Sequence, residues 1–225
     1  MKMKTFFFVI ILFVIVGCKE FSATGSGEVE ENIGIIIGDI VNVRETPAVN
    51  GKIISQLKDG AHVKVTEKTQ NPMQVGKHFD RWVKIRTKEN VAGYVFGAFL
   101  FELDELFRGF HWNYVTYSEW AFGLKFKRDK KVTFVYAYGT LNKAEYEYDI
   151  QGRQLILKGM KADFLPSTLY FYRYQGQYYL ARNKLSSEPV FSNEIEKNQA
   201  LFSNRNSGME NFIKNFRPES RESAR

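Results

Sequence analysis

The chain has 225 residues, with 32 Lys and Arg against 25 Asp and Glu, and a formal net charge of +7 at neutral pH. This mild positive charge, without a block of basic residues or an RNA-recognition motif, argues against nucleic acid as a partner, although it suits anionic lipid or cell-wall polymers. A single cysteine excludes a disulfide within the chain, so stability has to come from core packing.

Residues 1–17 predict a secretory signal peptide. Lys2 and Lys4 precede an apolar run from Phe6 to Val16, which is the length of the hydrophobic region of such signals. The run is too short to cross a membrane, because a transmembrane helix needs about 20 apolar residues. We therefore expect this segment to be removed on export.

The end of this segment, Ile15-Val16-Gly17-Cys18, resembles the lipobox of bacterial lipoprotein signal peptides. The resemblance implies that the chain is cut before Cys18, that its thiol carries lipid, and that the protein is anchored to the cell membrane or outer membrane, outside the cytoplasm. Lys19 after the cysteine favours the outer membrane where two membranes exist. The alternatives are a plain secretory signal with an incidental cysteine and an uncleaved anchor helix.

Residues 18–32 are small, polar and acidic without a hydrophobic period, which is typical of a flexible tether. From 33 to 103, short β-branched runs alternate with turn residues, which predicts a small all-β domain. The expected strands are 33–37, 40–43, 53–57, 62–66, 82–86 and 91–96.

Within this domain, Val41-Asn42-Val43-Arg44 followed by Pro47 resembles the opening of bacterial SH3-type (SH3b) domains. Later landmarks follow in the family's order: Ile54-Ser55-Gln56-Leu57, Asp59-Gly60, Trp82-Val83-Lys84-Ile85, Gly93-Tyr94-Val95 and Phe99-Leu100. The resemblance implies an SH3-like small barrel that recognises short peptides or cell-wall stems in a groove edged by loops, without catalytic residues.

By matching position, Arg44, Trp82 and Tyr94 are the candidate ligand-binding residues of this domain, although we expect Trp82 to serve mainly in the core. A long insert from Glu67 to Asp80 departs from the family pattern and would lie beside the groove. The identity of the ligand is therefore left open by the sequence.

Residues 104–184 predict a second, separate domain that is rich in aromatic residues and contains every tyrosine except Tyr94. Its expected strands are 121–127, 132–138, 144–150, 154–158, 168–174 and 177–182. Six consecutive antiparallel strands must hide their edges, which favours a curled β-meander or small barrel. The pattern is faintly similar to lipocalin-like domains. With strands predicted in both domains, the expected fold class of the whole chain is mainly β.

Four tyrosines of the last two strands are candidates for an aromatic binding face: Tyr170, Tyr172, Tyr174 and Tyr178. Their hydroxyls could serve as polar groups on an apolar surface for a lipid, a glycan or a peptide. The alternative is that these side chains belong to the core.

Catalytic, metal and cofactor sites are not expected. Glu145, Glu147 and Asp149 alternate along one strand and would lie in a line on a solvated face, with Tyr146, Tyr148 and Ile150 on the other face. The histidines stand singly, without the spacing of a zinc site, and no nucleophile motif is present.

The tail, residues 185–225, is polar apart from one expected short helix at 208–216. Met209, Phe212, Ile213 and Phe216 form its apolar stripe, which would dock on its own domain or on a partner.

These observations favour a non-enzymatic, lipid-anchored envelope protein whose SH3-like domain binds a peptide or cell-wall ligand. The alternatives are a lipocalin-like carrier of a small molecule or lipid, an accessory to a cell-wall hydrolase, and a surface adhesin. The oligomeric state is not indicated.

Overall fold

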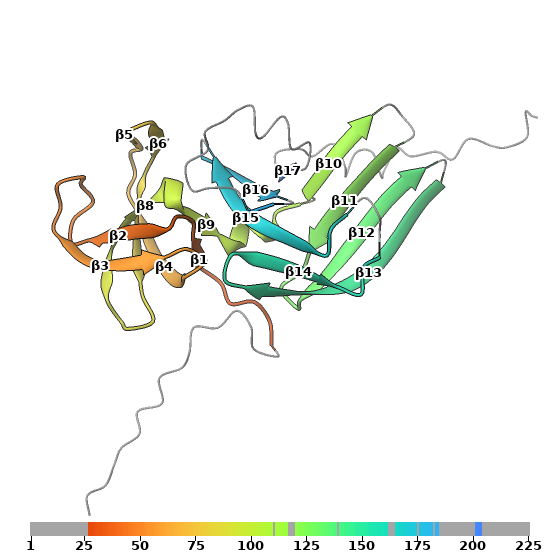
Figure 1. The fold of residues 1–225 in the computed structure, drawn as a ribbon, viewed down its shortest axis with the longest axis horizontal. Helices are drawn as coiled ribbons and strands as arrows, with labels where there is room; N and C mark the ends of the chain where they lie inside the picture. Colours follow the sequence, from red (N-terminus) through yellow and green to blue (C-terminus); the bar gives the residue numbers. More distant parts are fainter. Residues whose placement is uncertain are drawn as a thin grey trace, which may run out of the picture.

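Two β domains follow one another along the chain in a computed structural model (Figure 1). The structure describes residues 27–109, 111–116, 120–138, 140–161, 165–174, 176–181, 183–184 and 201–203. The expected mainly β, antiparallel fold class is confirmed. The signal segment, Cys18 and the expected helix at 208–216 lie outside the described residues. In the described part of the chain, no helix is long and apolar enough to cross a membrane.

The N-terminal domain is a seven-stranded antiparallel sheet in the order β3-β2-β8-β7-β4-β1-β9, with a separate two-stranded hairpin, β5–β6. Its elements are β1 (Ile33–Ile36), β2 (Ile40–Arg44), β3 (Ile53–Lys58), β4 (His62–Lys68), β5 (Met73–Val75), β6 (His78–Asp80), β7 (Trp82–Arg86), β8 (Ala92–Phe96), the 3-10 turn η1 (Gly97–Phe99), β9 (Leu100–Glu102) and the 3-10 turn η2 (Leu103–Phe107). All six predicted strands are present. β-Branched residues such as Val41, Val43 and Ile85 occupy buried positions in these strands, where their side chains pack well. The hairpin and β9 were not predicted.

Gly93 marks a place where β8 crosses close to β2. A Cβ atom at this position would lie 2.6 Å from Val43 Cγ1 and 2.8 Å from the carbonyl oxygen of Arg44. Because one of these atoms belongs to the backbone, the Gly93→Ala variant is expected to lower the free energy of unfolding by about 1–3 kcal/mol. Urea denaturation would measure this loss, and an unchanged midpoint would contradict it. Gly27→Ala, where nothing lies within 4 Å, is the matched control.

The C-terminal domain is an antiparallel barrel whose strands follow in chain order. They are β10 (His111–Thr116), β11 (Trp120–Phe126), β12 (Lys131–Tyr138), β13 (Thr140–Gln151), β14 (Gln154–Lys158), β15 (Thr168–Tyr174), β16 (Gln177–Ala181) and β17 (Leu201–Ser203). The barrel closes because β17 pairs with both β16 and β10. The sequence predicted six of these strands and missed β10 and β17. The predicted alternation in β13 is confirmed, since Tyr148 and Ile150 are buried while Glu145 and Glu147 are exposed.

The two domains share one hydrophobic core, which differs from the expected separate second domain. Side chains from β1 and β9, including Ile33, Ile35 and Phe101, belong to the same buried cluster as Phe171 and Leu180 of the barrel. The ring of Phe101 lies 4.7 Å from that of Phe171. Strands β1 and β9 therefore bury one face in the core of the N-terminal sheet, through Ile36 and Leu100, and the other face against the barrel.

The expected tether is also shorter than predicted at its C-terminal end. Val29 is buried in the shared core, and its amide donates a hydrogen bond of 2.8 Å to the carbonyl of Arg128 in the barrel. A single valine among polar residues carries no periodic signal, so its burial could not be anticipated.

Candidate functional site

An apolar groove of about 360 Å³ opens on the N-terminal domain between β2 and the β5–β6 hairpin. Its apolar lining comes from six elements or loops of the domain: Ile40 and Val41 of β2, Val49 of the β2–β3 loop, Val75 of the hairpin, Trp82 of β7, Phe96 of β8 and Phe99 of η1. Ile40 and Val49 are 66% and 51% exposed, so these apolar side chains face solvent rather than a partner in the fold. The groove thus presents apolar surface that the folded chain leaves uncovered.

Trp82 forms the floor of this apolar groove. Only 4% of its surface is exposed, and its ring packs edge-on against Phe96 at 5.4 Å between centroids. Its indole N–H points at the sulfur of Met73 in β5, at 3.0 Å. Trp82 therefore combines the core role expected of it with a place in the groove lining.

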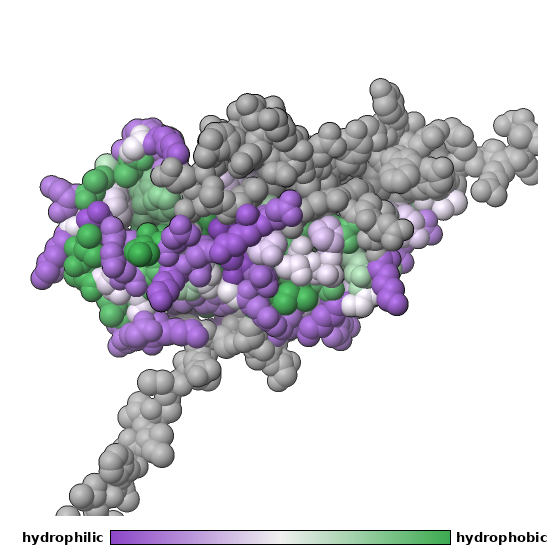
Figure 2. All heavy atoms as spheres, viewed as in Figure 1, coloured by the Kyte–Doolittle hydropathy of each residue, from purple (hydrophilic) through white to green (hydrophobic). Residues whose placement is uncertain are grey.

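The hairpin β5–β6 forms one wall of the groove, in the segment predicted to be an insert beside it. Its residues Met73 and Phe79 are exposed, and the ring of His78 packs edge-on against Phe99 at 5.1 Å. Figure 2 shows hydrophobic side chains gathered on the N-terminal domain, over β2 and β3, between hydrophilic ones. Ile40, Ile53 and Ile54 are the exposed apolar residues of these two strands.

Polar groups in the groove lining are few and of both charges. Asp39 and Arg44 carry the charges, and Asn42 lies between them in sequence. Arg44 donates a hydrogen bond of 2.6 Å to the carbonyl of Gly51, which orients its guanidinium along the β2–β3 loop. A groove with apolar walls and a few oriented polar groups suits a ligand that has an apolar body and polar backbone or end groups.

Tyr94, the third residue expected at the groove, does not line it. Tyr94 lies on β8 opposite Arg44, half-buried, with the ammonium of Lys84 5.8 Å from its ring centroid. The family pattern indicated its strand, but of the residues of β8 it is Phe96 that lines the groove.

The four tyrosines expected to form one aromatic face are divided between two faces of the sheet. Tyr170, Tyr172 and Tyr174 alternate along β15, whereas Tyr178 lies opposite Arg173 and so shares the other face. Tyr172 and Tyr178 are buried. The register therefore places Tyr178 on the other face of the sheet from Tyr170 and Tyr172, because successive residues of a strand point to opposite faces.

Of the acidic residues of β13, Glu145 and Glu147 are exposed, as expected, whereas Asp149 is half-buried. Glu145 forms ion pairs with Lys127 and Lys131, and Asp149 with Lys130. The hydrogen bonds and charges of Lys127 and Lys131 lower the pKa of Glu145. Among the described residues, no group of three His, Cys, Asp or Glu side chains is placed to hold a metal ion.

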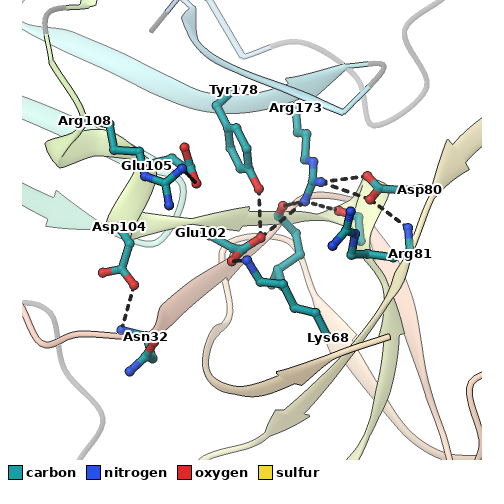
Figure 3. A network of polar contacts seen from close by, with 12 residues as sticks. Asn32, Lys68, Asp80, Arg81, Glu102, Asp104, Glu105, Arg108, Arg173 and Tyr178 are labelled. Atoms are coloured by element: carbon teal, nitrogen blue, oxygen red, sulfur yellow. Dashed lines mark hydrogen bonds and ion pairs between the residues drawn. The ribbon is translucent and has the colours of Figure 1, made fainter. Parts of the chain in front are cut away.

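A buried network of charges joins the two domains beside the groove (Figure 3). Arg173 of β15 forms an ion pair of 2.8 Å with Asp80 at the end of β6, and Tyr178 donates a hydrogen bond of 2.8 Å to Glu102 of β9. Lys68 of β4 completes this network through an ion pair with Glu102. Burial raises the pKa of the Tyr178 hydroxyl, so it remains a proton donor.

A second interdomain ion pair lies at the turn between β3 and β4. Arg153 of the barrel contacts Asp59 at 3.3 Å, and Lys184 contacts the same carboxylate at 2.9 Å. Burial raises the pKa of Asp59, but its bonds to Lys184, the Gly38 amide and Arg153 outweigh this, so the pKa is lowered. Gly60, with φ +79°, packs directly on Gly152 of the barrel in this turn.

The sequence reasoning missed Arg153 and Arg173. Arg173 did carry a signal, because it continues the alternation of Leu169 and Phe171, both buried. A cation on the apolar face of a strand requires a buried partner of opposite charge, although its identity could not be read from the sequence.

Comparison with known families identifies residues 39–101 as a bacterial SH3 domain. The matched range reaches from Asp39, just before β2, into β9, so it contains the hairpin wall and the groove lining except Gly38. No curated protein matches the chain. The predicted SH3b resemblance is thereby confirmed for this part of the chain, and a bacterial SH3 domain indicates a non-enzymatic binding role.

Proposed function

We propose that this chain is a non-enzymatic, lipid-anchored protein of the cell envelope whose N-terminal domain binds short peptides or the peptide stems of the cell wall. The apolar groove carries the proposal, because it lies between the loops of a bacterial SH3 domain and exposes apolar walls. An apolar side chain of the ligand would lie between Ile40, Val75 and Phe99. Asp39 and Arg44 would meet an ammonium and a carboxylate group of the ligand.

Anchoring would allow a groove of low affinity to keep its ligand bound. A lipid on Cys18 would hold the domain close to its ligand, and the segment between Cys18 and Val29 would supply reach. Confinement raises the effective concentration of the binding partner, so residence at the wall does not require high affinity.

Ile40→Asp tests the groove. The side chain is largely exposed, so the substitution leaves the fold intact, but it places a carboxylate where an apolar ligand group would be buried. Retention of the full chain, in detergent, on purified cell-wall sacculi is expected to fall about tenfold, the equivalent of about 1.4 kcal/mol.

The matched control is Ile53→Asp, which introduces the same charge on β3 outside the groove lining. Its retention should equal that of the unaltered chain. Equal losses in both variants would indicate a general charge effect and contradict the groove as binding site. Deleting the N-terminal domain would be a poor test, because the deletion exposes the shared core of the barrel.

Cys18→Ser tests the anchor. The serine hydroxyl cannot replace the thiolate nucleophile, so the variant is expected to lose lipid, to retain residues 1–17 and to shift from the membrane to the soluble fraction. Labelling with a fatty acid and the intact mass of the purified chain would measure both changes. A variant that is still labelled and correctly cut would refute the proposed anchoring. Ser22→Ala serves as a control that keeps Cys18.

A carrier role for the barrel has weaker support. Closure of the barrel favours it, but the described buried side chains of the barrel, such as Phe126, Phe134 and Leu155, pack together with those of β1 and β9 into one core. A bound lipid would have to displace this packing.

A further inference from the structure

The wall of the groove opposite β2 consists of two segments that contact each other. The hairpin β5–β6 supplies Val75, and η1 supplies Phe99. The amide of Gly97 donates a hydrogen bond of 2.8 Å to the carbonyl of Arg81, directly after the hairpin. The position of this wall therefore depends on how the end of β6 and the turn η1 are held together.

Arg173 of the barrel contacts both of these segments. Its Nη1 donates hydrogen bonds to the carbonyls of Gly97, at 2.8 Å, and Leu100, at 3.0 Å, which lie at the two ends of η1. Its Nη2 lies 2.8 Å from Asp80 Oδ2 at the end of β6. The side chain is only 7% exposed, so these contacts are formed away from water. One guanidinium thus joins the base of the hairpin to the turn that carries Phe99.

Arg153 of the barrel acts on the opposite side of the groove. It pairs with Asp59, and the same carboxylate oxygen accepts a hydrogen bond of 3.1 Å from the amide of Gly38, a residue of the groove lining. The barrel therefore contacts residues that hold both walls of the groove in place.

We propose that the C-terminal barrel sets the shape of the binding groove, with Arg173 as the principal positioning residue and Arg153 as a second one. Neither residue touches the ligand. Each positions backbone that does, because a planar guanidinium can donate to several acceptors at once in a fixed geometry. The inference gives the second domain a role in the proposed function, and it rests on that function only where ligand binding is concerned.

Arg173→Lys in the full chain tests the inference. Lysine keeps the positive charge opposite Asp80 but cannot reach the carboxylate and both carbonyls together. Hydrogen exchange followed by mass spectrometry is expected to show several-fold faster exchange of amides in 73–80 and 97–101. Exchange in β2–β3 and in β12–β13 should stay unchanged. Faster exchange everywhere, or no change in the two wall segments, would overturn the inference.

Arg128→Lys is the matched control. Arg128 is also a barrel arginine that pairs with the N-terminal domain, but its partners are Asp104 and the carbonyls of Val29 and Glu30, none of which lines the groove. This variant should leave the exchange of the wall segments unchanged. Faster exchange of the walls in Arg128→Lys would show that any loss at the interface suffices, which contradicts a specific role for Arg173.

Retention on sacculi separates the inference from the proposed function. If the unaltered chain is retained, Arg173→Lys should reduce retention several-fold and Arg128→Lys should not; equal retention of all three would overturn the positioning role. If the unaltered chain is not retained, the proposed ligand is wrong, while faster exchange confined to the two walls in Arg173→Lys would still support the positioning role.

Discussion

Replacing Phe101 with alanine is expected to lower the free energy of unfolding of the whole chain by about 3–5 kcal/mol. Phe101 belongs to β9 of the N-terminal domain, yet its buried ring lies 4.7 Å from Phe171 and 5.2 Å from Tyr178 of the barrel. Truncation would leave a cavity lined by both domains. The loss should therefore appear in both domains together.

Urea denaturation with pulsed hydrogen exchange would follow this loss in β7 and β12 separately. A single shared midpoint that shifts in both strands is the expected result. Two midpoints, of which only one shifts, would show that the domains unfold independently. Phe79→Ala is the control, since that ring is 58% exposed and its removal should change stability by no more than about 0.5 kcal/mol.

Replacing Arg173 with methionine is expected to cost about 3–5 kcal/mol of stability. Methionine fills similar volume but leaves the buried carboxylate of Asp80 without its cation, and it removes the donor from the carbonyls of Gly97 and Leu100. The loss comes mainly from the unpaired groups that remain, because breaking a buried pair costs more than the pair contributes when intact.

A double variant, Arg173→Met with Asp80→Asn, tests this reason. Removing the orphaned charge should recover part of the loss measured for Arg173→Met, and a purely additive loss would contradict the pairing. Lys131→Met is the control, because Lys131 and its ion-pair partner Glu145 are both exposed, at 48% and 44%. Its effect should stay below about 1 kcal/mol. Thermal or urea denaturation would compare the three variants.

The sequence predicted the strands better than the contacts between them. Strands β7, β14 and β15 have the predicted bounds, since β-branched and aromatic runs between turn residues are a local signal. The hairpin β5–β6 and strands β9, β10 and β17 were missed. The hairpin strands, β9 and β17 have only three residues each, too few for a period to be recognised.

The candidate site was predicted in part. Arg44 and Trp82 line the apolar groove, as their positions in the SH3b pattern implied, and the insert does form a wall beside it. Ile40, Val49, Val75 and Phe99 were not proposed as site residues. An exposed apolar residue and a core residue look the same in a sequence, and only the fold decides which remain uncovered.

What the sequence determined by itself was local: the alternation that makes each strand, the glycines of the turns and the SH3b pattern. The tertiary structure decided which faces meet. β1 and β9 bury Ile35 and Phe101 against the barrel, and Arg173 reaches Asp80 although 93 residues separate them. Period-two alternation assigns a side chain to a face but does not name the surface that covers it. The shared core and the support of the groove therefore had to be read from the folded chain.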